Sequence, residues 1–297
     1  MFKTFTASVL AATSAAMSIS NSTQAFNSTM DLSNSTETCS KDGWTESGQI
    51  TWIREGTTIE NTIITCEPDT EFCVKANNDN ITFRNVIIYH PANGMGLFSW
   101  KAANLTLENV QIIAYGNEWG AQPCPTKAPM NGYRCSNMEI SWAENLVIKN
   151  TEVENGSRGI SLRFSDGAVL DHVVARNVRG PQPGGECFQF LYSDHVTMTN
   201  FHCKNDVEIG YNADAISIWR SSHAHLEDGV VDGNTSPTGQ CVMFEGSEHG
   251  TKDGYLVNVE AINCKGCFGA FPLEGLYSSN NTCASPICQS NNPARGA

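Results

Sequence analysis

A short alternating phrase occurs three times in this chain and limits its possible folds more than any other feature. The hexamers NITFRN, NLTLEN and NLVIKN begin at Asn80, Asn104 and Asn145, and each places apolar residues second and fourth between two asparagines. The starting points are 24 and 41 residues apart. Looser copies of the phrase follow in the second half of the chain. Self-similarity at a period of roughly 20–50 residues indicates a repeat architecture.

Each copy has the pattern of two short strands. The phrase alternates apolar and polar residues and is rich in Ile, Val, Leu and Thr, and a second apolar run such as GISLRF or AISIW follows. Such a unit cannot bury its apolar face alone, whereas stacked units bury a continuous core. We therefore expect an all-β protein, a single right-handed parallel β-helix (solenoid) of roughly eight coils. An antiparallel sandwich would instead show hairpin signals every 8–12 residues or so.

Stacking of coils also explains the asparagines. Equivalent positions on successive coils lie above one another, so a side-chain amide at a coil corner can bond to the next. We expect one ladder through Asn80, Asn104 and Asn145, and another through Asn85, Asn109, Asn150 and Asn200. Stacking would satisfy amides that are costly to bury unpaired.

Some of these asparagines also lie in N-x-S/T glycosylation sequons. The sequon asparagines beyond the first 25 residues are Asn27, Asn34, Asn80, Asn104, Asn155, Asn234 and Asn280. An amide buried in a ladder cannot carry a glycan, so at Asn80 and Asn104 we favour the ladder.

The ends of the chain and its cysteines indicate export. Residues 1–25 combine one basic residue, a short apolar run and a small-residue site, which is typical of a signal peptide. We interpret 26–45 as a polar segment, 46–276 as the β-helix with an inserted loop at 116–135, and 277–297 as a cysteine-bearing tail. No segment has the length and hydropathy of a membrane span. We expect a secreted, extracellular glycoprotein that is monomeric.

The chain contains 12 cysteines, and an even number after a signal peptide favours disulfides. Local pairs are favoured: Cys66 with Cys73, Cys124 with Cys135, and Cys283 with Cys288. The Cys264-Lys-Gly-Cys267 motif has no second CxxC or His pair, so we interpret it as a structural disulfide or two packed thiols rather than a zinc site.

The net charge of −13 argues against nucleic acid as a partner. It would also repel an acidic polysaccharide unless a cation bridges the two.

One stretch, NDVEIGYNADAISIWRSSHAHLEDG, concentrates polar and aromatic residues. The expected solenoid, over roughly 46–275, resembles the pectate-lyase-like superfamily, which includes pectate and alginate lyases, polygalacturonases and uronan epimerases. NADAISI is similar to the N-x-D-x-I-x-I phrase of polygalacturonases, and its matching residues are Asn212, Asp214, Ile216 and Ile218. The next coil departs from that family, because Gln240-Cys241 stands where paired aspartates are expected, and no Arg-x-Lys follows His249-Gly250. Inverting hydrolysis needs two carboxylates, and the Tyr-Gly-x-Asp-Pro phrase of the epimerases is missing, so the resemblance favours a lyase.

Alignment of the second strands of successive coils predicts three outward rows. The first contains Arg158, Glu186 and Asp214, the second Arg163, Trp219 and Glu245, and the third Phe164, Tyr192 and Arg220. Carboxylates one coil apart are about 5 Å from each other, close enough to share a calcium ion.

From these rows and the resemblance we assign candidate site residues. The catalytic candidates are Asp214, Arg220 and Arg163. Candidates for substrate binding are Glu186, Trp219, Glu245 and His249. Glu186 and Asp214 are also candidate calcium ligands. Simpler interpretations remain open: Asp214 as a turn residue bonding its own backbone, and Arg220 as a surface ion-pair partner.

The expected function is that of a lyase on an acidic, uronate-containing polysaccharide. The alternatives are a non-catalytic carbohydrate-binding or cell-wall surface protein, and a divergent glycoside hydrolase or epimerase. An ice-binding role would need a repetitive threonine column, which the outward positions lack.

Overall fold

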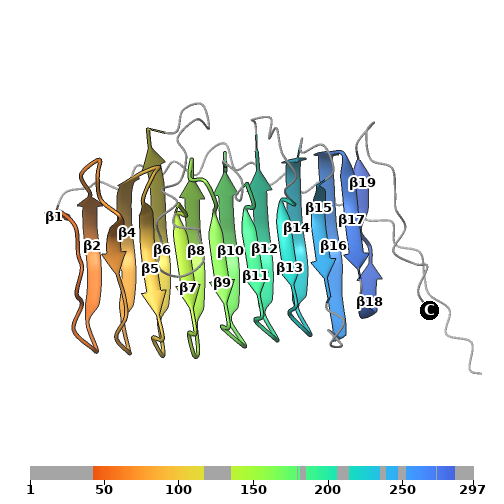
Figure 1. The fold of residues 1–297 in the computed structure, drawn as a ribbon, viewed down its shortest axis with the longest axis horizontal. Coiled ribbons are helices and arrows are strands. Elements are labelled where there is room, and N and C mark those ends of the chain that lie inside the picture. Colours follow the sequence, from red (N-terminus) through yellow and green to blue (C-terminus); the bar gives the residue numbers. More distant parts are fainter. Residues whose placement is uncertain are drawn as a thin grey trace, which may run out of the picture. The chain divides into compact units, whose positions relative to one another are not determined.

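The computed structural model describes residues 43–116, 135–178, 180, 185–205, 214–234, 239–246, 252–271 and 273–284. Within these ranges the chain contains strands and no helix, and it winds into about seven turns of a parallel solenoid, close to the number expected (Figure 1). The expected all-β parallel solenoid is thus confirmed. The expected signal peptide and most of the inserted loop lie outside the described residues.

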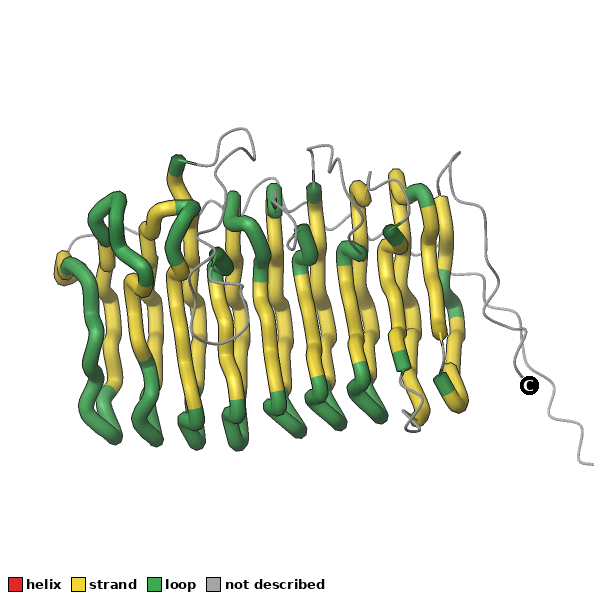
Figure 2. Tube along the Cα trace, viewed as in Figure 1, coloured by secondary structure: helices red, strands yellow, loops and turns green. Residues whose placement is uncertain are grey.

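Two parallel sheets form the solenoid, and from β2 to β18 successive strands alternate between them. Sheet A runs in the order β1 (Thr45–Ser47), β2 (Thr58–Thr65), β4 (Thr82–Pro91), β6 (Thr106–Tyr115), β8 (Val147–Glu154), β10 (Val169–Arg176), β12 (Thr197–Lys204), β14 (His225–Asn234), β16 (Lys252–Cys264) and β18 (Glu274–Ser279), with β19 (Thr282–Ala284) also paired to β16. Sheet B runs in the order β3 (Phe72–Lys75), β5 (Met95–Trp100), β7 (Met138–Ser141), β9 (Ile160–Arg163), β11 (Phe188–Leu191), β13 (Ile216–Trp219), β15 (Gln240–Glu245) and β17 (Gly266–Phe271). Strands alternate with short turns along this region, and they continue past the expected boundary at 276 (Figure 2).

The core consists of apolar side chains stacked in register between the sheets. In sheet A one buried column is Phe83, Leu107, Ile148, Leu170, Met198, Leu226 and Leu256. In sheet B another is Ile140, Leu162, Phe190, Ile218 and Phe244. Because side chains alternate along each strand, every second residue of the repeated phrase enters this core and its neighbours face outward.

Left-handed backbone residues form the corners of the coil. One such position interrupts the long strands of sheet A at equivalent places: Asn61, Asn85, Asn109, Asn150, His172, Asn200, Asp228, Asn258 and Asn280, all with φ between 47° and 55°. A second position begins those strands, at Gly56, Asn80, Asn104, Asn145, Gly167, His195, His223, Asp253 and Gly275. Asn, Asp, His and Gly tolerate this conformation better than other residues. The repeated asparagines are therefore required first by the backbone.

The predicted asparagine ladders are present in part. Asn85 Nδ2 donates to Asn61 Oδ1 at 2.9 Å, and Asn109 Nδ2 donates to Asn85 Oδ1 at 3.1 Å. At the other corner, Asn104 Nδ2 donates to Asn80 Oδ1 at 2.9 Å.

The same series continues where Asn145 Nδ2 donates to Asn104 Oδ1 at 3.0 Å. The expected burial is wrong, because a corner in the left-handed conformation turns these side chains toward solvent. Asn200 also differs from the expectation, since its amide donates to Asp171 instead of to an asparagine.

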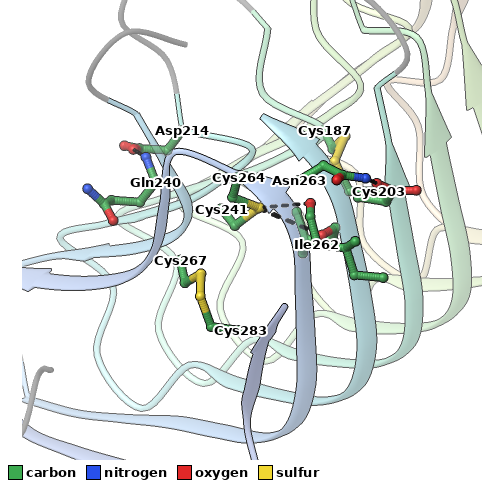
Figure 3. The surroundings of a disulfide bond; sticks show 12 residues. Cys187, Cys203, Asp214, Gln240, Cys241, Ile262, Asn263, Cys264, Cys267 and Cys283 are labelled. Atoms are coloured by element: carbon green, nitrogen blue, oxygen red, sulfur yellow. Dashed lines mark hydrogen bonds between the residues drawn. A yellow bond between two sulfur atoms is a disulfide. The ribbon is translucent and has the colours of Figure 1, made fainter. Parts of the chain in front are cut away.

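The disulfides join the two sheets within single coils (Figure 3). The predicted Cys66–Cys73 bond is confirmed, and the other bonds between described residues are Cys187–Cys203, Cys241–Cys264 and Cys267–Cys283.

Two cysteine predictions are wrong. Cys264 and Cys267 bond to different partners, and Cys283 bonds to Cys267 instead of Cys288. The reason is geometric: a cysteine of a sheet B strand meets a cysteine of the following sheet A strand in the same coil, inside the core for Cys241–Cys264 and at the exposed β19 for Cys267–Cys283. Cys135 is disulfide-bonded, but its expected partner Cys124 lies outside the described residues.

The disulfides fit an oxidising compartment such as the extracellular space. Among the described residues there is no helix long and apolar enough to cross a membrane.

Candidate active site

The register of sheet B confirms the alignment of the three rows, although Arg158 and Glu186 of the first row are buried and not outward. Arg163, Leu191, Trp219 and Glu245 are direct partners on successive strands. The paired core residues Ile160, Phe188 and Ile216 place Arg158, Glu186 and Asp214 at one level, two residues earlier on each coil. The third row follows the strands: the Phe164, Tyr192 and Arg220 N–H groups each donate to the next coil. The roles of these residues remain predictions.

Glu186 and Arg158 form a buried ion pair at the first level. Arg158 Nε donates to Glu186 Oε2 at 3.1 Å, and the two side chains are only 3% and 12% exposed. Gln189 Nε2 lies 3.4 Å from the other carboxylate oxygen, Oε1. Both carboxylate oxygens of Glu186 are therefore engaged by the side chains of Arg158 and Gln189.

Asp214 lies one coil beyond Glu186, where its Oδ1 accepts a hydrogen bond of 2.7 Å from the Gln240 backbone N–H (Figure 3). Burial raises the pKa of Asp214 to about 7. The Gln240 hydrogen bond opposes this shift, and the negative charges of Glu245 and Glu186 add to it.

Burial also raises the pKa of Glu245, and the charge of Glu186 adds to the effect. The three carboxyl groups are thus within electrostatic range of one another. An acid that keeps its proton near neutral pH beside an ionisable neighbour is an arrangement suited to general acid–base catalysis.

Arg163 and Arg220 lie in different surroundings. Arg163 Nε lies 3.9 Å from Glu139 Oε1. Arg220 is exposed and follows β13 directly, whereas Asp214 precedes the same strand, so the two lie at opposite ends of it. Asp214 therefore shares its end of the strand with Glu186, whereas Glu245, the partner of Trp219, lies at the Arg220 end and influences Asp214 through its charge.

Arg220 contacts aromatic side chains instead. Its Nη1 donates to the Tyr192 hydroxyl at 3.0 Å, and its guanidinium lies over the Trp219 ring at 4.5 Å from the ring centroid. Trp219, which the sequence places in an outward row, is half-buried, and Arg220 covers one of its faces.

The described residues do not fit a calcium ion by themselves. Calcium prefers six to eight oxygen ligands, whereas the oxygens of Glu186 are engaged by Arg158 and Gln189, and burial favours the protonated form of Asp214. In the described part of the chain no group of three or more His, Cys, Asp or Glu is placed to hold a metal. We derive no chemical step through calcium.

Sequence reasoning missed the roles of some side chains, and other residues that it named lie outside the described part of the chain. It put Arg158 in the correct row without identifying it as the partner of Glu186, and it noted Gln240 only as a departure from a family pattern. The signal available for Arg158 was its charge, opposite to that of Glu186 at the equivalent position one coil later. His249 and residues 117–134 of the inserted loop lie outside the described residues.

Comparisons with known proteins give no family for this chain. No family model matches it, and no curated protein matches it. Among solved structures, it is similar to QnrB1, a plasmid-mediated fluoroquinolone resistance protein, with 9% sequence identity over 81% of this chain and 90% of that chain and a TM-score of 0.19. A likeness at this TM-score supports no conclusion about fold or function.

Proposed function

We propose that this protein is a secreted lyase that cleaves an acidic, uronate-containing polysaccharide along the outer face of sheet B. The observation that carries the proposal is the electrostatic influence that Glu186, Asp214 and Glu245 exert on one another from adjacent coils of that face. The resemblance to pectate-lyase-like proteins suggested the substrate class, and the disulfides support an extracellular setting.

The carboxyl groups of Asp214 and Glu245 can supply both proton transfers of a β-elimination. Such a reaction needs a base for the proton beside the uronate carboxylate and an acid for the leaving glycosidic oxygen. In our proposal ionised Glu245 takes the first proton and protonated Asp214 gives the second. The bond between C4 and the leaving oxygen breaks as the C4–C5 double bond forms, so no water is consumed.

The uronate carboxylate must also be neutralised for its neighbouring proton to become acidic. Arg163 lies on the same row as Glu245, and Arg220 follows Trp219 of that row. We assign to these two arginines the binding of substrate carboxylates. Glu186 holds its position through Arg158 and acts by keeping the local potential negative.

Hydrolysis is the second candidate, and one observation favours it. Inverting glycosidases use a protonated carboxylic acid and a second carboxylate that activates water. Asp214, with a pKa of about 7, and Glu245 provide groups of both kinds.

Product analysis separates the candidates. The purified protein is incubated with polygalacturonate, alginate and chondroitin sulfate, and unsaturated products are followed by ultraviolet absorbance beside reducing ends. Unsaturated ends support the lyase, reducing ends without unsaturation support hydrolysis, and retention on a substrate column without products supports a binding protein.

Two substitutions test the residues. Asp214→Asn and Glu245→Gln should each abolish turnover while the circular dichroism spectrum is retained. Glu108→Gln, on the exposed side of β6, is the matched control and should keep full activity. Full activity in both site variants would overturn the assignment.

A further inference from the structure

The third corner of the coil uses residues that the backbone does not favour. Directly after the strands of sheet B, five successive coils place Lys101, Trp142, Phe164, Tyr192 and Arg220 in the left-handed region, with φ between 48° and 60°. Bulky side chains are uncommon there and strain the backbone. Every other left-handed position among the described residues is Asn, Gly, His or Asp.

This contrast indicates that the third corner is selected for its side chains. Asn would relieve the backbone at every coil, as it does elsewhere in the same solenoid. Strain that persists at aligned positions is typical of functional surfaces.

The side chains at this corner form one continuous stack. The Trp142 and Phe164 ring centroids are 4.2 Å apart and the planes nearly parallel, and Phe164 and Tyr192 are similarly stacked at 4.9 Å. Trp219 meets Tyr192 edge-on at 5.1 Å. We call these four aromatic residues the aromatic spine.

Two members of the aromatic spine are exposed to solvent, and the other two are half-buried. Trp142 and Phe164 are 45% and 37% exposed and adjoin one another, and contiguous exposed apolar side chains mark interaction surfaces more than single ones do. Because the rings face one another, solvent meets their edges as an apolar strip.

Cations occupy both ends of this strip. Lys101 holds the equivalent position one coil before Trp142, and Arg220 holds it one coil after Tyr192. Positive ends on a chain whose net charge is −13 make this corner complementary to an anionic ligand. The span of four coil steps is roughly 19 Å, enough for several sugar units.

We propose that the aromatic spine, with Lys101 and Arg220, binds an extended acidic polysaccharide, whose apolar sugar faces lie across the ring edges and whose carboxylates meet the two cations. This inference rests on the proposed function, since it names a substrate-binding surface beside the proposed catalytic carboxyl groups of Asp214 and Glu245. It assigns Trp142, Phe164 and Tyr192 to substrate binding and not to proton transfer.

The test is affinity electrophoresis in gels containing polygalacturonate or alginate, with dextran as the neutral control. Wild-type protein should be retarded by the acidic polymers and not by dextran, and added salt should weaken the retardation. The double variant Phe164→Asn/Tyr192→Asn should bind about tenfold more weakly, the loss expected when aromatic contacts worth about 1.4 kcal/mol are removed. Asn suits the backbone at these positions, so the unfolding temperature should stay close to the wild-type value.

The matched control is His172→Asn, an exposed left-handed residue at a corner of sheet A. It should leave the retardation unchanged. Equal retardation of wild type and double variant, or no retardation of wild type by either polymer, would overturn the proposal. The proposal would also be overturned if the wild-type protein were a dimer and the double variant a monomer, because the spine would then be a contact between copies.

Failure of the proposed function gives a different result. If Asp214→Asn keeps full turnover while the spine variant loses retardation, the catalytic assignment falls and the binding surface stands. If the spine variant keeps its retardation and Asp214→Asn loses turnover, the reverse holds.

Discussion

Arg158 Nε donates a hydrogen bond to Glu186 Oε2 across adjacent coils, and both side chains are buried. Breaking such a pair from one side leaves a buried charge without its partner. The ion pair therefore links the stability of the solenoid to the electrostatics of the carboxyl groups of Glu186, Asp214 and Glu245.

We expect Arg158→Met to lower the free energy of unfolding by about 3–5 kcal/mol, because Glu186 then remains buried without its cation. Urea denaturation measures the loss. Arg84→Met is the control, since Arg84 bridges Glu60 and Glu108 on the exposed side and should change stability little. Equal losses of unfolding free energy in the two variants would show that the buried Arg158–Glu186 pair contributes no more than the exposed pairs of Arg84.

Asp214 should make the protein less stable as pH rises. Its folded pKa of about 7 exceeds the ordinary value of 3.8, so the native state keeps a proton that the unfolded chain releases. Its contribution is complete below the ordinary pKa and is lost as pH rises toward 7. Asp214→Asn should remove this dependence from unfolding free energies measured at pH 4–7. An unchanged pH dependence would contradict the raised pKa.

His90 should act in the opposite direction. It is fully buried, its Nδ1 lies 3.0 Å from the Pro91 carbonyl oxygen, and burial lowers its pKa from 6.5 to about 4. The unfolded chain therefore binds a proton that the native state excludes, and stability falls as pH drops from 6.5 to 4. His90→Gln should flatten this acid limb, whereas Asp214→Asn should leave it more visible. The prediction fails if the acid limb is the same in wild type and His90→Gln.

The disulfide between Cys241 and Cys264 should contribute about 3 kcal/mol, because it closes a loop with a sequence separation of 23 residues in the unfolded chain. Replacing both cysteines with alanine should lower the urea midpoint correspondingly. Non-reducing peptide mapping checks the pairing, with linked fragments expected for Cys241–Cys264 and Cys267–Cys283. A fragment linking Cys264 to Cys267 would contradict the structure.

The sequence was sufficient for the fold because its main signal is repetitive. The phrase beginning at Asn80 and Asn104 specifies strand, corner and step length together, and parallel stacking then follows. The rows through Asp214 and Glu245 were predictable for the same reason, since equivalent positions on aligned coils must share a level.

The remaining features depend on contacts across the coil, which no local pattern encodes. Cys267 has a cysteine three residues away, yet it bonds to Cys283, which lies on β19 of the facing sheet in the same coil. The pKa of Asp214 likewise depends on burial and on charges from two other coils. Asn104 was placed correctly in its ladder but on the wrong side of the surface, because the backbone conformation decides that side.

The left-handed corners divide the chain into interchangeable units. Asn85 and Asn109 are separated by 24 residues and have nearly the same backbone conformation. Removing or duplicating that interval would therefore join equivalent points of the backbone and leave each remaining turn unaltered. A protein of this kind can change the length of its surface by whole turns during evolution, without redesigning its interior.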